Sequence, residues 1–128
     1  MAGSFTNFLE NAVLGHVFGG TPYTPPSLYV GLFTATPSEA GGGTEVAGNS
    51  YVRMPAAFTV SGNQAVNTAT VEWPTASGSG WGALTQMAVF DALTGGNMLA
   101  WGDLTNPRTV LAGDIARFTA GQLTITLD

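Results

Sequence analysis

Apolar and aromatic positions near the start of the chain recur at steps of three and four residues, the spacing of one face of an α-helix. The positions that share this face, with a histidine among them, are Phe5, Phe8, Leu9, Ala12, Val13, His16 and Val17. Ser4 has the side chain of a helix N-cap, and Gly19 and Gly20 supply a helix stop. The pattern therefore predicts a helix within residues 1–20.

The spacing changes after residue 20. Residues 21–27, "TPYTPPS", carry three prolines, which suit neither a helix interior nor a central strand, so we expect a stiff connector. In residues 28–34, "LYVGLFT", alternate positions are apolar on both faces, which indicates a strand buried on both sides.

Short alternating segments continue to the end of the chain, separated by glycine-bearing turns such as "SGNQ" and "TGGN". Beyond residues 28–34 the predicted strands are residues 51–54, 57–60, 65–73, 83–91, 98–104, 108–111, 115–118 and 122–127. A leading helix followed only by strands argues against a parallel α/β fold. We predict a mostly β single domain over residues 1–128. Residues 28–128 form an antiparallel β-sandwich or jelly-roll-like barrel of about eight strands, with one N-terminal helix before it.

Residues 39–51, "EAGGGTEVAGNSY", form a glycine-rich segment between two predicted strands. No Lys-Ser/Thr pair and no helix start follows the glycines, so the segment is not a phosphate-binding loop. Strands of one small fold flank it, so it is not a linker between domains. We predict a surface loop that bends at residues 41–43, runs briefly extended at residues 44–46 and turns at residues 48–49. Such a loop is mobile unless a neighbour holds it, and we expect Glu45 and Val46 to contact another subunit.

Charged residues make up only 9% of the chain, against about 25% in a typical soluble domain. There is no lysine, and the arginines are Arg53, Arg108 and Arg117. We infer that other subunits cover much of the surface. The net charge of −5 argues against a nucleic-acid partner, which needs clustered basic residues.

The chain contains no cysteine, which excludes a disulfide scaffold and a thiolate metal site. Its first twenty residues have neither the basic start of a signal peptide nor the continuous apolar run of a membrane span, so we predict no membrane insertion.

Candidate catalytic residues are few. His16 is the only histidine, and at the end of the predicted helix it suits the helix dipole. Glu72, Asp91 and Asp103 are candidates for a glycosidase pair, but acids at strand ends are what turns require. No Gly-x-Ser-x-Gly motif occurs. We predict no catalytic residue, no metal site and no cofactor.

Aromatic residues offer a second candidate chemistry. They could line a carbohydrate-binding platform, but burial in the core or at a subunit interface is the commoner role of such rings. The residues concerned are Trp73, Trp81, Trp101, Tyr23, Tyr29 and Tyr51. The arginines are expected in single ion pairs rather than in a binding patch. Arg108 lies near Asp103 in the sequence, and Arg117 lies near Asp114.

Four stretches cover most of the chain and together carry a family resemblance: "NFLENAVLGHVFGG", "TPYTPPSLYVGLFTATPSEAGGGTEVAGNSYVR", "GWGALTQMAVFDALTGGNMLAWGDL" and "AGDIARFTAGQLTITLD". The most specific parts are "LYVGLFTATP", "GGGTEV", "FDALTGGN" and "LTITLD". The chain resembles small tailed-bacteriophage virion proteins, commonly called phage tail fibre proteins. The resemblance implies a protein of the virion exterior, assembled in the bacterial cytoplasm and without enzymatic activity.

Three functions remain open. The first is a capsid decoration (cement) protein that clamps major capsid subunits as a dimer or trimer, because a compact chain without repeats suits a shell better than a long fibre. The second is a tail-associated module of a fibre, baseplate or neck, with a role in host attachment. The third is a glycan-binding or glycan-cleaving protein. The candidate interface residues are Phe5, Phe8, Tyr23, Pro25, Pro26, Glu45, Val46, Trp81, Trp101 and Arg108.

Overall fold

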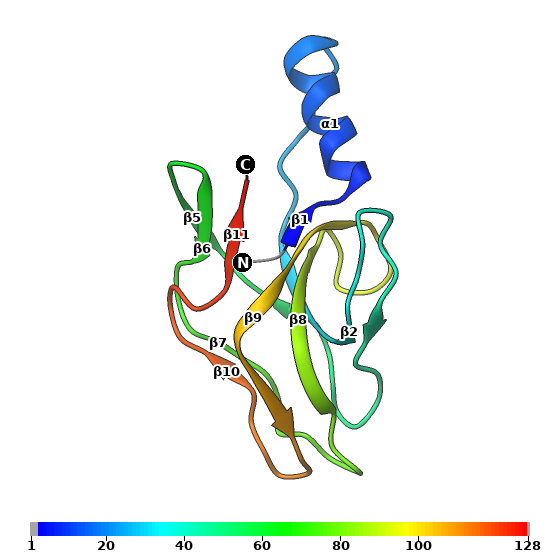
Figure 1. Ribbon diagram of the computed structural model, residues 1–128, viewed down its shortest axis with the longest axis vertical. Helices are drawn as coiled ribbons and strands as arrows, with labels where there is room; N and C mark the ends of the chain where they lie inside the picture. The colour runs from blue at the N-terminus through cyan, green and yellow to red at the C-terminus, as the bar shows by residue number, and fades with distance from the viewer. Residues whose placement is uncertain (1–2, 128) are drawn as a thin grey trace.

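The computed structural model describes residues 3–127 and shows a mostly β protein, a β-sandwich of antiparallel strands with a helix projecting beyond it (Figure 1). The predicted fold class is confirmed. The elements in chain order are β1 (Gly3–Phe5), α1 (Asn7–Phe18), β2 (Tyr29–Ala35), β3 (Thr44–Glu45), β4 (Met54–Pro55), β5 (Phe58–Ser61), β6 (Gln64–Asn67), β7 (Val71–Glu72), β8 (Gly82–Phe90), β9 (Met98–Val110), β10 (Arg117–Phe118) and β11 (Thr124–Thr126).

The larger sheet has the strand order β1-β9-β8-β2-β3, and β4 also pairs with β2. A three-stranded sheet, β11-β6-β5, and a two-stranded pair, β10-β7, lie beside it. One core cluster joins residues of the large sheet, such as Leu32, Leu84 and Met87, to Phe118 and Ile125 of the smaller sheets. Burial of these apolar side chains holds the layers together.

The large sheet is apolar on both faces, as the sequence of residues 28–34 predicts. Val30 and Leu32 of β2 point into the main core. Phe33 points to the opposite face, where it forms a second cluster with Ala88 and Phe90. This outer cluster exists because strand residues alternate between faces, and it provides the floor of the site described below.

Helix α1 begins later than expected. Ser4 lies in β1, and the cap is Thr6, whose hydroxyl accepts a hydrogen bond from the Leu9 N–H at 3.4 Å. The same hydroxyl donates to the Met98 carbonyl at 2.6 Å, so the cap also anchors the helix to β9. Phe5 therefore belongs to a strand and not to the helix face.

Two predicted strands are joined in β9. Residues 98–104 and 108–111 form the single strand Met98–Val110 despite Pro107. Leu84 of β8 pairs with Arg108 while Gln86 pairs with Asp103, so residues 104–107 bulge out of the ladder. A proline is tolerated there because its missing N–H is not needed for pairing.

The predicted strand over residues 65–73 is instead divided into β6 and β7. The Asn67 side chain donates to the Ala69 and Thr119 carbonyls, at 2.9 and 3.0 Å, and accepts from the Leu123 N–H at 2.9 Å. These bonds satisfy backbone groups at the point where the chain leaves one small sheet for the other.

Candidate interaction surface

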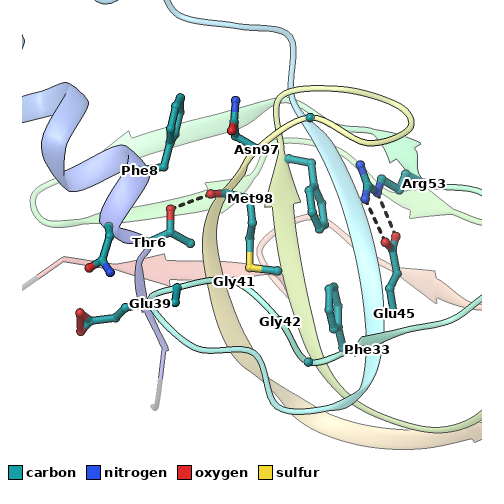
Figure 2. Close-up of a pocket in the computed structure, with 15 residues that line it drawn as sticks. Thr6, Phe8, Phe33, Glu39, Gly41, Gly42, Glu45, Arg53, Asn97 and Met98 are labelled. Atoms are coloured by element: carbon teal, nitrogen blue, oxygen red, sulfur yellow. Dashed lines mark hydrogen bonds and ion pairs between the residues drawn. The ribbon is translucent and has the colours of Figure 1, made fainter.

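A hollow of about 450 Å³ lies on the outer face of the large sheet (Figure 2). Its floor is the outer apolar cluster, with Phe33, Phe90 and Met98. Its walls come from the start of α1, the glycine-rich loop and the turn between β8 and β9. The hollow thus combines an apolar floor with walls that carry carboxylate, amide and guanidinium groups.

The glycine-rich loop forms one wall and has the predicted conformation. Gly41, Gly42 and Gly43 all have positive φ, which an L side chain disfavours, and β3 follows them as an extended pair. A Cβ on Gly43 would lie 2.8 Å from the carbonyl oxygen of Ala35, so the chain passes too close to β2 for any side chain there.

The loop is fastened within the chain by one arginine. Arg53 Nε lies 2.9 Å from Glu45 Oε2, and its Nη1 donates to the Ala92 and Gly95 carbonyls at 3.0 and 2.8 Å. The guanidinium carbon also lies 3.5 Å from the centre of the Phe90 ring, a cation–π contact. We call this set of contacts the Arg53 clasp; it joins the loop, the turn after β8 and the floor of the hollow.

Tyr51 contacts the Glu45 carboxylate of the Arg53 clasp and links it to β2. Its hydroxyl donates to Glu45 Oε2 at 2.7 Å and accepts from the Leu32 N–H at 2.9 Å. Burial, followed by the hydrogen bond to the Glu45 carboxylate and its negative charge, raises the pKa of Tyr51 well above its usual value. The phenol therefore stays protonated and keeps the carboxylate oriented toward Arg53.

The loop is consequently held by its own subunit. Val46 is buried in the main core, and the Asn7 N–H donates to the Glu39 carbonyl at 2.8 Å. Asn49 accepts a hydrogen bond from Trp81 Nε1 at 2.9 Å. The expectation that only a neighbour would hold the loop does not account for these contacts, which join the loop to its own subunit. A contact of Glu45 or Val46 with another subunit stays a prediction.

The three candidate catalytic acids lie apart from one another, and each makes a contact that stabilises the fold. Glu72 forms an exposed ion pair with Arg117 at 2.5 Å, and Asp103 accepts a hydrogen bond from Gln86 at 3.2 Å. Asp91 accepts from the N–H and the amide of Asn97, at 2.7 and 3.0 Å. Burial raises the pKa of Asp91, but these hydrogen bonds outweigh it and hold the pKa below its usual value. Among residues 3–127 no group of three metal-ligating side chains is assembled.

The arginine partners differ from those that sequence proximity suggests. Arg117 pairs with Glu72 across β10 and β7 rather than with Asp114. Arg108 donates to the Arg117 carbonyl at 3.1 Å and lies over the Phe118 ring, at 4.6 Å from its centre, instead of pairing with Asp103. Both arginines therefore contact residues on another strand and not the acids that lie near them in the sequence.

The tryptophans do not form a shared platform. Trp73 and Trp81 are buried in the main core, and Trp101 is half-buried beside the outer cluster. Tyr51 packs edge-on against Trp81, with ring centres 5.3 Å apart. The core role of Trp73 and Trp81 is therefore confirmed, which removes them from any surface that recognises sugars.

The remaining interface candidates lie at the start of α1 and along the connector. Phe8 is 40% exposed and lines the hollow, and Tyr23 of the connector packs edge-on against it with ring centres 6.5 Å apart. Pro25 is exposed and Pro26 half-buried, while Phe5 is half-buried against the core. Phe8 is thus the candidate that the structure brings to the hollow together with Glu45.

The Arg53 clasp was not among the predicted sites. The scarcity of arginine was a signal that Arg53 makes a specific contact. It did not identify Glu45 as the partner, because the two residues are eight positions apart across a turn. Their proximity depends on the positive φ values of Asn49 and Ser50, 54° and 70°, which reverse the chain between them.

The structure is a β-sandwich with a hollow over an aromatic floor, and the candidate acids Glu72, Asp91 and Asp103 each make a structural contact. The chain matches the family of the podophage GP4 fiber I protein gp80 over residues 4–126, and it belongs to that family. No curated protein matches it. Within the described residues, no helix is long and apolar enough to span a membrane.

Family membership confirms the resemblance to phage virion proteins of the tail fibre type. A fibre family implies a structural component of the virion that contacts other virion proteins. It favours the tail-associated hypothesis over capsid decoration, which stays unconfirmed.

Proposed function

We propose that the chain is a non-enzymatic structural module of a phage tail, associated with the fibre and docked on neighbouring tail proteins. The family match over residues 4–126 is the observation that carries this proposal. Capsid decoration rested on the compact shape and the low charge, and a tail module shares both properties. The match to a fibre family supports the tail module.

We propose further that the hollow is the docking surface. Met98 on its floor and Phe8 at its edge are partly exposed and can contact an apolar side chain of a partner, and its walls offer Glu39 and Asn97 as hydrogen-bonding groups. Interfaces between proteins have this composition, an apolar centre within a polar rim. The Arg53 clasp holds the walls in place before binding, which reduces the entropy lost when a partner docks.

The location of the chain on intact particles tests the tail assignment. In quantitative gels of purified virions, a tail module is present at a small multiple of the tail symmetry, whereas a decoration protein approaches the copy number of the major capsid protein. Labelled antibody should mark the tail in electron micrographs. Labelling over the head, at capsid-like copy number, would overturn the proposal.

A pair of substitutions tests the docking surface. Phe8→Glu places a charge at the edge of the hollow, and we expect particles that contain little of the variant chain. Leu111→Glu is the matched control, because Leu111 is also exposed, at 60%, but does not line the hollow. Equal incorporation of the two variants would contradict docking at this surface.

Absence of enzymatic activity is tested directly. Purified protein is incubated with host polysaccharide, and we expect no release of reducing ends. Should release occur, Glu72→Ala and Asp91→Ala variants show whether either carboxylate is responsible, and loss of cleavage in one of them would replace the structural proposal with an enzymatic one.

A further inference from the structure

Helix α1 exposes apolar side chains that the rest of its own subunit does not cover. Val13, Leu14, Val17 and Phe18 lie at steps of one, three and four residues and so form one stripe over the last two turns, the α1 stripe. The exposed fractions are 55% for Leu14, 62% for Val17 and 83% for Phe18. No residue of α1 is buried.

The composition of α1 is that of a buried helix. From Asn7 to Phe18 its only acidic residue is Glu10, and it has no lysine or arginine. Apolar helices of this kind are stable in proteins when packing covers them, and an isolated helix of about 12 residues is marginal in water. We therefore expect the α1 stripe to pack against another apolar surface.

A second apolar surface lies at the base of the helix. It is a groove of about 260 Å³ between the large sheet and the β5-β6 hairpin, and all of the described residues that line it are apolar. Val60, at 72% exposure, forms part of its rim, and Leu99 and Ala100 form part of its floor. We call it the apolar groove.

The α1 stripe does not reach the apolar groove of its own subunit. Leu9, in the first turns of α1, is the helix residue that lines the groove. Phe18 lies nine residues further on, about 13 Å along the helix axis, and Figure 1 shows α1 pointing away from the sandwich. The stripe and the groove can therefore meet only between two molecules.

We propose that two copies of the chain exchange their α1 helices, so that the α1 stripe of each copy packs in the apolar groove of the other. A second copy is favoured over a foreign partner because the chain carries both halves of the contact. Both surfaces are free of charge, and one two-fold arrangement covers two stripes and two grooves at once. A two-fold interface of this reciprocal kind closes on itself and does not grow into a filament.

The expected interface is small. A helix of 12 residues is about 18 Å long and about 10 Å across. The stripe spans only the last two turns, about 9 Å, and covering half of each helix over that length, together with the groove surface it meets, buries roughly 600 Å² in total, less than a stable specific interface. We therefore expect a weak, reversible dimer whose fraction rises with concentration between about 10 μM and about 1 mM.

Sedimentation of the purified full-length chain from about 10 μM to about 1 mM tests for the dimer. Val17→Glu places a charge in the α1 stripe, and Val60→Glu places a charge at the rim of the apolar groove. Each substitution should raise the dissociation constant of the dimer at least about tenfold. Leu111→Glu, equally exposed but outside both surfaces, should leave it within about twofold. Thermal unfolding of each variant checks that the sandwich is intact. A wild-type chain that stays monomeric, or a dimer unaffected by Val17→Glu and Val60→Glu, would overturn the proposal.

Cross-linking distinguishes helix exchange from other dimers. The chain has no cysteine, so Phe18→Cys and Val60→Cys each introduce a single thiol at an exposed position. When the two variants are mixed, a short bis-maleimide should give a product of twice the 13.1 kDa chain mass that contains one copy of each. Preferential linking of Phe18→Cys to itself would show helix-to-helix pairing and refute the exchange. The result does not depend on where the chain sits on the particle, so it stands or fails separately from the tail assignment.

Discussion

The glycine-rich loop, residues 39–51, and α1 contact each other through the Asn7 N–H and the Glu39 carbonyl, but they are held to the sandwich in different ways. The loop has the composition of a flexible segment and is tied down by Arg53, Tyr51 and Val46. Helix α1 has the composition of a core element and is fastened mainly at its first turn.

The difference shows that composition alone is a poor guide to which segments a subunit holds by itself. The loop makes an ion pair, hydrogen bonds and a buried apolar contact within its own subunit, so no partner is required to position it. The helix satisfies its backbone internally but leaves its side chains exposed, so a partner would stabilise it. Four substitution experiments, three of them with a second variant for comparison, test this difference.

The largest expected effect is at the Arg53 clasp. Arg53→Ala leaves the carboxylate of Glu45 without its cation and removes two hydrogen bonds to carbonyls, so we expect the free energy of unfolding to fall by about 3 kcal/mol. Arg117→Ala is the control, because it also breaks an arginine–glutamate pair. The side chains of the first pair are 11% and 22% exposed and those of the second 55% and 48%. The control should cost less than about 1 kcal/mol, measured by urea unfolding. Equal losses would mean that the clasp does not hold the loop.

A second test concerns the backbone of the loop. Gly43→Ala places a Cβ 2.8 Å from the Ala35 carbonyl oxygen at a φ of +73°, and we expect a loss of about 2 kcal/mol. At Gly42, φ is +76° but no atom lies within 4 Å of the added Cβ, so Gly42→Ala should cost about 1 kcal/mol. The same unfolding measurement applies. If the two variants were equal, the close approach to β2 would not restrain the loop.

Tyr51 gives the third and smaller effect. Tyr51→Phe removes a buried hydroxyl that bridges Glu45 and the Leu32 N–H, and we expect a loss of about 1.5 kcal/mol at neutral pH. The folded-state pKa of Tyr51 is raised above the ordinary value of 10.0. The folded state therefore binds the phenolic proton more tightly than the unfolded state does, and the free energy of unfolding falls as the pH rises above about 10.

The control for this pH dependence is the Tyr51→Phe variant itself. Its unfolding curve should decline less steeply above about pH 10 than that of the wild-type chain, because the shifted group is gone. Identical slopes would show that Tyr51 does not carry the alkaline sensitivity, and that its hydroxyl is more accessible than its contacts with Glu45 and Leu32 indicate.

Much of the fold follows from the sequence, and the exceptions have identifiable causes. The period-two pattern located β2 and β8 closely, because both faces of these strands are apolar. The same pattern wrongly predicted two strands where β9 is one, because a local pattern does not reveal that residues 104–107 around Pro107 bulge opposite β8. It joined β6 to β7, because the hydrogen bonds of Asn67 that separate them come from residues far away in the chain.

The candidate surface was harder to predict than the fold. The bends of the glycine-rich loop were evident from residues 41–43, since glycine is the residue that positive φ favours. The pairing of Glu45 with Arg53 was not, because ion pairs depend on which strands become neighbours. The same cause explains why Arg117 pairs with Glu72, 45 residues away, rather than with a nearby acid.

The smallest expected effect lies on α1. Leu14→Gln changes an exposed residue to one of similar helix propensity, so at low protein concentration the free energy of unfolding should change by less than about 0.5 kcal/mol. The same change at Leu84, which is 0% exposed in β8, buries an amide in the core and should cost about 3 kcal/mol or more. If Leu14→Gln at low concentration destabilised the chain by more than about 1 kcal/mol, α1 would already be covered within the monomer. The helix would then be held as the loop is, and the contrast between the two regions would disappear. A loss that emerges only as concentration rises would instead show that a second molecule covers the α1 stripe, because association stabilises the folded chain with the logarithm of the partner concentration.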